Sequence, residues 1–231
     1  MKLHIFGTQA LRGIQPGRSS IAWALEKDGI LHWFEAGENC SRTAFFMGLE
    51  NNRICRIFLS GLQLDFCSGL TGLLGRMKEP CQIYTPVENA LDGFEKFFRK
   101  LGTGTAALKE HFMGSSGSAE QDGVNVSWRS AEKGYIFRIE SEKKKIVYAP
   151  SVVSADELGD WLRDPDLLIW GTVNVGAVEI CRKLKHEKRH VGKLVLICHD
   201  GAETEDDIRS RVADIGASDV YFAEDAQTFE L

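Results

Sequence analysis

The order of hydrophobic patterns along the chain is the feature that most constrains its fold. Residues 2–6 ("KLHIF") and residues 20–37 read as strands by their alternation of apolar and polar side chains. From residue 55 onward, short apolar strands are each followed by a segment with helical spacing, as in "CRIFLSG" (55–61) and "SGLTGLLGRMK" (68–78). Strands come first and strand–helix units follow, so we expect an α/β protein with mixed sheets.

Turn signals divide this pattern into elements. Lys27-Asp28-Gly29 is a hairpin turn between two alternating segments. Ser41 and helical spacing predict a short helix over residues 41–54, and residues 154–164 predict a capped helix. Residues 102–123 are rich in Gly and Ser and predict a mobile connection, and the alternation in residues 124–151 predicts three strands. The last fourteen residues predict a closing pair of strands. The sequence contains no internal repeat and no linker composition, so we expect one domain over residues 1–231.

Charge and cysteine content limit the function classes. The net charge is −5, which argues against a general polyanion binder. A basic run at residues 182–190, "RKLKHEKRH", is the local exception and predicts weak RNA binding. Its cations are Arg182, Lys183, Lys185, Lys188 and Arg189. A solvated helix end is the favoured alternative, because no aromatic residues interleave the charges.

Location follows from the cysteines and the first residues. Six cysteines lie far apart without a CxxC pair, and "MKLHIFGTQ" is a strand and turn rather than a signal peptide. We therefore expect a cytoplasmic protein with reduced thiols. No apolar run has the roughly 18 to 20 residues that span a bilayer.

Several segments together resemble ribonuclease Z-type proteins of the metallo-β-lactamase-fold superfamily. They are the opening strand "MKLHIFGT", the hairpin ending "LHWFEAGENC", the strand–turn–helix segment "RICRIFLSGLQLDFCSGLTGLLG" (53–75), the late strand "LVLICHDG" and the closing "SDVYFAEDAQTFEL". The resemblance covers almost the whole chain. It implies a four-layer αββα sandwich of two mixed β-sheets flanked by helices, and a homodimer.

In that family two metal ions, usually zinc, are held by an HxHxDH motif and by later His and Asp residues. The metals make a hydroxide near neutral pH, which attacks a phosphodiester or acyl carbon. Laid on this pattern, the ligand positions define a relic pocket in which Asp65 alone is an unambiguous ligand type. The relic pocket comprises Ser60, Gly61, Gln63, Asp65, Phe66, Ser151, Thr172, Cys198 and His199.

The loss of imidazoles predicts a non-catalytic protein that binds a ligand or protein partner through the relic pocket, with no catalytic residue and no cofactor. The alternative is a metal-dependent hydrolase of phosphodiesters with a rearranged site, using zinc or manganese with Asp65, Cys198 and His199. The alternative for Asp65 is a purely structural role, in which its side chain caps the following helix.

A second group of candidate residues follows the loop at Pro16-Gly17. Arg18, Ser19 and Ser20 offer a guanidinium and hydroxyls that suit a phosphate or carboxylate ligand. In the resembling fold this loop borders the active-site cleft. A plain strand start is the equal alternative.

Overall fold

The computed structural model describes residues 1–9, 17–49, 53–75, 77, 79–100, 108–197, 204–215 and 219–231, without the side chains of residues 98 and 99. These residues form two compact units. The first unit contains both ends of the chain and most of residues 1–114, and the second lies within residues 115–223. Each unit contains one seven-stranded mixed sheet.

The first sheet begins as an antiparallel meander and continues with parallel strands. Its order is β14 (Thr228–Glu230), β1 (Lys2–Gly7), β2 (Ala22–Lys27), β3 (Ile30–Phe34), β4 (Arg53–Phe58), β5 (Cys81–Thr85) and β6 (Leu108–Phe112). The predicted turn between β2 and β3 is present: Asp28 and Gly29 both have positive φ, at 51° and 76°. Two such residues in succession match the twist of a hairpin.

The second sheet has the same mixed character. Its order is β13 (Val220–Phe222), β12 (Lys193–Ile197), β11 (Leu167–Gly171), β10 (Lys144–Ala149), β9 (Gly134–Ser141), β8 (Val124–Ala131) and β7 (Ser116–Gln121). Strands β7 to β10 pair antiparallel, and β10 to β13 pair parallel. The predicted three strands after residue 123 are β8, β9 and β10.

Two predictions about strands are wrong. The region 102–123 is not a connection, because it contributes β6 to the first sheet and β7 to the second. Strand β7 pairs with β8 through main-chain hydrogen bonds, which need no hydrophobic alternation. The last two strands do not pair with each other: β13 pairs with β12, and β14 pairs with β1.

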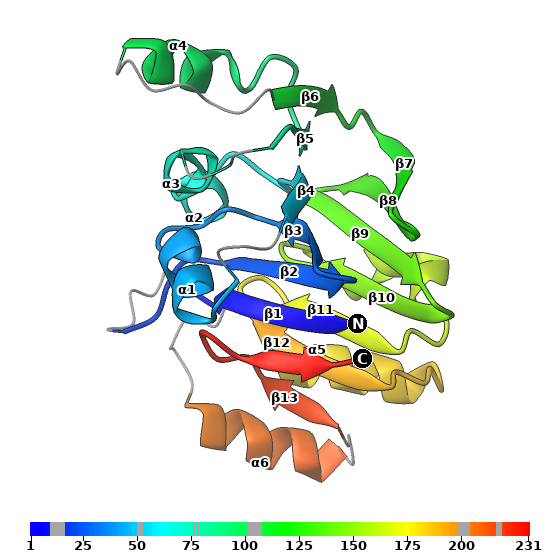
Figure 1. Ribbon diagram of the computed structural model, residues 1–231. Coiled ribbons are helices and arrows are strands. Elements are labelled where there is room, and N and C mark those ends of the chain that lie inside the picture. Colours follow the sequence, from blue (N-terminus) through cyan, green and yellow to red (C-terminus); the bar gives the residue numbers. More distant parts are fainter. Residues whose placement is uncertain are drawn as a thin grey trace. The chain divides into compact units, whose positions relative to one another are not determined.

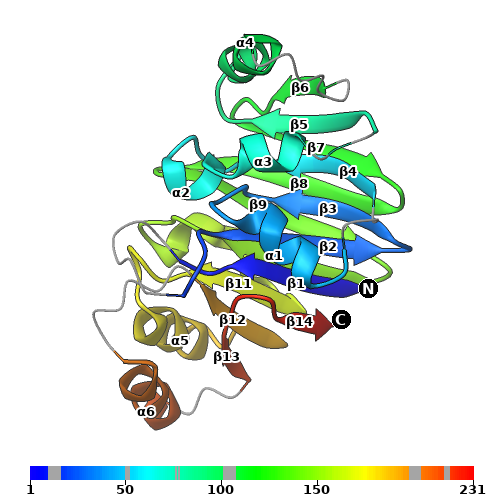
Figure 2. The same ribbon diagram turned by 60° about the vertical axis from the view of Figure 1, so that its left-hand side comes forward.

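Helices cover one face of the first sheet (Figures 1 and 2). They are α1 (Cys40–Phe46), α2 (Leu64–Cys67), α3 (Leu70–Leu74) and α4 (Asp92–Lys100). Helix α1 is shorter than the predicted 41–54, because Gly48, with φ at 74°, follows its end. The predicted helix at 68–78 is also shorter, because only α3 lies within that range and α2 precedes it. Buried residues such as Leu31, Trp33 and Leu70 form the core beneath them.

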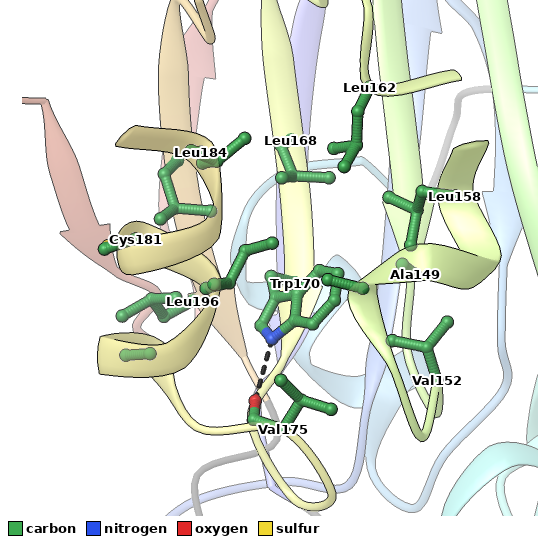
Figure 3. Packing of buried hydrophobic residues seen from close by; sticks show 14 of the residues in the cluster. Ala149, Val152, Leu158, Leu162, Leu168, Trp170, Val175, Cys181, Leu184 and Leu196 are labelled. Atoms are coloured by element: carbon green, nitrogen blue, oxygen red, sulfur yellow. Dashed lines mark hydrogen bonds between the residues drawn. The ribbon is translucent and has the colours of Figure 1, made fainter. Parts of the chain in front are cut away.

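The second unit has its own core around Trp170 of β11 (Figure 3). The indole Nε1 donates to the carbonyl of Val175 at 2.9 Å. The 3₁₀ helix η1 (Ala155–Leu162) and the α-helices α5 (Ala177–His186) and α6 (Glu205–Ile215) pack against this core. A capping box of Ser154 and Glu157 starts η1, in agreement with the capped helix predicted at residues 154–164.

The predicted α/β class with two mixed sheets flanked by helices is confirmed. The expectation of one domain stays a prediction. None of the helices within the described ranges has the length and apolar character that a membrane crossing requires.

Candidate functional site

The segment that follows β4 carries most of the predicted relic pocket, and we call residues 60–67 the corner. The chain leaves β4, turns at Gly61, and forms the single turn of α2. Gln63 is the N-cap of α2 in extended conformation, and its carbonyl accepts from Phe66 N at 2.9 Å. The turn therefore brings the side chains of Gln63 and Phe66 close to Gly61.

The space beside Gly61 is filled by the protein itself. A Cβ atom at residue 61 would overlap the side-chain amide oxygen of Gln63 and would lie 3.1 Å from Cδ2 of Phe66. Phe66 is buried, with 6% of its surface exposed. An imidazole at position 61 would therefore have to displace an amide and approach a phenyl ring.

Glu35 is a residue of this site that the sequence analysis did not single out. Its side chain is fully buried at the end of β3, and its carboxylate accepts from the main-chain N–H of Ser60 at 3.0 Å. Glu35 has a positive φ of 58°, and its own N–H donates to Phe58 at 2.9 Å. An acidic residue directly after a buried strand was the available signal. Glu35 fixes the end of β4 at the point where the corner begins.

Main-chain hydrogen bonds and close backbone packing hold the corner against the turn after β3. Gly69 N donates to Ala36 at 2.8 Å, and Ala36 N donates to Phe66 at 2.6 Å. A Cβ on Gly37 would lie 2.5–2.6 Å from backbone atoms of Ser20, Ile21 and Asp65. Glycine is required at position 37 because main-chain atoms cannot move aside as a flexible side chain can.

Two buried polar atoms of the corner, Ser60 Oγ and Asp65 Oδ1, have no hydrogen-bond partner among the described residues. A buried polar atom that loses its hydrogen bonds costs about 1–3 kcal/mol. Helix α2 has no side-chain cap, so Asp65 does not take the capping role considered above. Both atoms are therefore available for a bound molecule or water.

Cys67, the last residue of the corner, has a neutral thiol. Its Sγ donates to the carbonyls of Gln63 at 3.3 Å and Leu62 at 3.4 Å. Burial raises the pKa of Cys67, and the carboxylates of Glu35 and Asp65 raise it further. The thiol therefore stays protonated at neutral pH.

The remaining relic-pocket positions belong to the second unit. Ser151 is half-buried, and its carbonyl accepts from Asn174 Nδ2 at 3.1 Å. Thr172 donates from Oγ1 to the carbonyl of Ile197 at 3.3 Å. Cys198 and His199 lie outside the described residues. At Ser151 and Thr172 these hydrogen bonds are accepted by main-chain carbonyl groups.

The donor set of the corner does not fit a dinuclear zinc site. Gly61 and Phe66 supply no donor, Gln63 supplies an amide, and one carboxylate, that of Glu35, already accepts from Ser60 N. Zinc in proteins is bound by three or four His, Cys, Asp or Glu side chains. Within the part of the chain that the structure describes, no three such residues are grouped so that they could hold a metal ion.

The predicted anion-binding segment at residues 18–20 is tied into the first unit. Ser19 donates its main-chain N–H to the carboxylate of Asp225, which also accepts from Thr8 Oγ1 at 2.8 Å. Arg18 Nη1 donates to the same Thr8 hydroxyl at 3.4 Å, and Ser20 forms an isolated bridge with Gln9. Asp225, which the sequence did not point to, holds this segment in place by these hydrogen bonds. The contacts favour the alternative that residues 18–20 only begin a strand.

The basic run is partly neutralised within the second unit. Glu187 accepts from Lys183 at 2.9 Å and from Arg189 at 3.3 Å. Lys183 also pairs with Asp156. Arg182, Lys185 and Lys188 are exposed. The five cations of the basic run therefore do not form one uniform patch of positive charge.

Similarity to curated proteins is confined to part of the chain. A ribonuclease Z of Methanococcus maripaludis (strain C6) is 38% identical over 96 residues, which are 39% of this chain and 30% of that protein. The chain therefore matches under a third of the length of this relative. No protein-family model matches the sequence.

Similarity to solved structures covers the whole chain. The metallo-β-lactamase fold protein YhfI from Bacillus subtilis superposes with a TM-score of 0.78 at 16% identity, covering 99% of both chains. Zn²⁺-bound PqqB from Methylobacterium extorquens gives 0.76 at 14% identity, covering 100% of both. The short form of human tRNase Z gives 0.76 at 19% identity, covering 100% of this chain and 99% of the other. The chain thus has the metallo-β-lactamase fold and resembles ribonuclease Z, as predicted.

Proposed function

We propose that this protein is a non-catalytic member of the metallo-β-lactamase fold that binds a small molecule at the corner. The proposal rests on the side chains around Gly61, which are not those that would bind a metal ion. Gln63 and Phe66 fill the space beside Gly61, while Ser60 Oγ and Asp65 Oδ1 have hydrogen bonds still to make. The corner thus lacks the ligands of a metal and keeps polar groups for an organic molecule.

The charges of the corner define the chemistry of its ligand. Asp65 and Glu35 supply carboxylates, and residues 60–67 contain no Lys, Arg or His. Asp65 accepts hydrogen bonds, and the Ser60 hydroxyl both donates and accepts. A neutral or cationic molecule with hydroxyl or amine donors satisfies both atoms. A phosphate would meet like charges without a compensating cation.

A hydrolase with a rearranged site is the second candidate. The partial identity to a ribonuclease Z supports it, and so does a neighbour described as a diphosphatase from the PhnP family, with a TM-score of 0.75 at 13% identity. Such a site would use Asp65 with Cys198 and His199, and zinc or manganese. It predicts metal-dependent cleavage of bis(p-nitrophenyl) phosphate that Asp65→Ala abolishes.

Metal analysis separates the two candidates. The full chain, purified without chelators, is assayed by elemental analysis and then titrated with zinc. We expect substoichiometric metal and no tight zinc binding. Two tightly bound zinc or manganese ions per chain, or metal-dependent turnover, would overturn the non-catalytic proposal.

Native mass spectrometry tests the ligand site directly. We expect a small molecule to be retained by the wild-type chain and lost from Ser60→Ala and Asp65→Asn. The matched control is Asp92→Asn, which removes an exposed first-turn carboxylate from α4 in the same unit. Equal retention by all three variants would contradict a site at the corner.

Self-association is proposed separately, from exposed aromatic residues. Helix α1 exposes 52% of Phe45 and 71% of Phe46, and α2 exposes 65% of Leu64. Large apolar side chains that are exposed to this extent support a protein interface. Sedimentation velocity should therefore give a dimer that Phe46→Ser weakens, and a monomer at all concentrations would contradict this.

A further inference from the structure

The second unit contains a cavity of about 260 Å³ at the end of the basic run. Helix α5 and the turn after it form one wall, and β12, the end of α6 and the start of β13 form the others. Figure 3 shows two of the lining residues, Cys181 and Leu184, on α5. The cavity lies within one unit, so its geometry does not depend on the other.

One part of the cavity lining is apolar. Leu184, Leu194, Ile215 and Val220 line it, and Leu184 and Leu194 are 9% and 4% exposed. Burial raises the pKa of the Cys181 thiol to about 11, so this wall is uncharged as well. Such walls favour an apolar group, because they offer it no hydrogen bond and exclude water from it.

The polar part of the lining has two cationic side chains, Lys185 and Arg189. The other polar residues that line it in the described part of the chain are His190 and Asp219. The Nζ atom of Lys185 donates to the carbonyl of Ile215 at 2.6 Å, a neutral partner, so its charge is not cancelled by that bond. An ammonium group has three donors and can hold a further acceptor. Arg189 shares Glu187 with Lys183, which leaves its guanidinium only partly compensated.

We propose that this cavity binds a small organic anion, a monocarboxylate with a compact apolar body. The carboxylate would lie against Lys185 and Arg189, and the body against the leucine-lined interior. The volume is just below the range of about 300–1,000 Å³ of typical ligand pockets, which restricts the ligand to a small one. An RNA phosphate would leave the apolar walls uncovered, and the described residues that line the cavity include no Phe, Tyr or Trp for base stacking.

The first experiment compares three probes of one chain length on the full-length protein. Hexanoate, hexan-1-ol and hexylammonium are titrated while methyl signals of Leu184, Leu194, Ile215 and Val220 are followed by NMR. We expect hexanoate to shift these signals and to bind at least tenfold more tightly than either other probe. Equal binding of the alcohol, preferential binding of the amine, or no saturable hexanoate shift at millimolar concentration would overturn the proposal.

The second experiment uses the basic run as its own control. The double variant K185Q/R189Q should weaken hexanoate binding at least tenfold. The double variant R182Q/K188Q removes the same charge from cations that do not line the cavity, and it should change binding less than twofold. Equal weakening by both pairs would indicate only a general electrostatic effect and would refute the site.

A third variant tests the apolar half without changing charge. Val191 lines the cavity and is half-buried, so Val191→Trp can fill the space without breaking the core. We expect this variant to keep its melting temperature and to lose hexanoate binding. A folded Val191→Trp protein that binds hexanoate normally would place the probe elsewhere and contradict the proposal.

Discussion

The side-chain amide oxygen of Gln63 occupies the space that a Cβ atom on Gly61 would need. The two residues lie in one turn, and the ring of Phe66 borders the same space. Because Gly61 has no side chain, the side chain of Gln63 can fold over the turn. This packing takes up room beside the first position of the metal motif that the sequence resembles.

Gly61→Ala should cost less than about 1 kcal/mol of the free energy of unfolding. The atom that it meets is the end of a flexible side chain, which can rotate away. In a Gln63→Ala background the cost should decrease but not vanish, because Cδ2 of Phe66 stays 3.1 Å from the new Cβ. Urea unfolding of the two single variants and the double variant gives this coupling.

Gly37→Ala is the matched comparison for that experiment. Its Cβ would meet backbone atoms of Ser20, Ile21 and Asp65, so we expect a cost above about 2 kcal/mol, through backbone strain. Equal costs at positions 37 and 61 would show that Gln63 cannot move and that the corner is rigid.

Asp65→Asn should leave stability unchanged or raise it by up to about 1 kcal/mol in the ligand-free protein. The substitution keeps the shape of the side chain and removes a charge whose Oδ1 atom is buried and has no described partner. Thermal unfolding measures the effect, with Asp92→Asn as the control. A loss above about 2 kcal/mol would instead assign Asp65 a structural role.

The buried pair of His32 and Arg56 predicts a pH dependence of stability. Burial and then the Arg56 charge lower the pKa of His32 to about 3, and Arg56 Nε donates to His32 Nδ1 at 2.8 Å. The unfolded chain takes up a proton near pH 6.5, while the folded chain does not until about pH 3. The free energy of unfolding should therefore fall as pH decreases through this window, by up to about 1.4 kcal/mol per pH unit.

His32→Asn tests this assignment, because its amide oxygen can replace Nδ1 as the acceptor for Arg56. The variant should lose that part of the pH slope, and His186→Asn, at an exposed position, should keep it. An NMR titration in which the His32 imidazole changes protonation near pH 6.5 in the folded protein would disprove the prediction.

Cys40 should be unreactive in the folded protein. Its side chain is fully buried, and burial raises the pKa of the thiol to about 12. Iodoacetamide at pH 8 should label it at least about a hundredfold more slowly in the native than in the urea-unfolded chain, as measured by peptide mass spectrometry. Rapid labelling of the native protein would contradict this prediction and make Cys40 a candidate nucleophile.

The features that the sequence predicted correctly depend on nearby residues. The turn at Asp28-Gly29 needs two residues that tolerate positive φ, and the capping box needs Ser154 and Glu157 three positions apart. Both requirements are local, so a short stretch of sequence specifies them. The missing donors at Gly61 and Phe66 could likewise be recognised without coordinates, because residue type alone decides what a side chain can ligate.

The features that were missed depend on contacts between distant residues. Strand β7 was read as a connection because its polar residues show no hydrophobic alternation, yet its backbone pairs fully with β8. Glu35 was overlooked because its partner, the N–H of Ser60, lies 25 positions further along the chain. Asp225 and Ser19 are 206 positions apart.

The amino-acid sequence by itself determined most of the strands, the predicted hairpin turn and the loss of imidazoles from the corner, since each follows from hydrophobic periodicity or from the chemistry of one or two side chains. Only the tertiary structure decided which strand joins which sheet, which carboxylate holds Ser60, and that an amide folds over Gly61. Those outcomes depend on sheet register and close packing, which bring together groups that no local pattern relates.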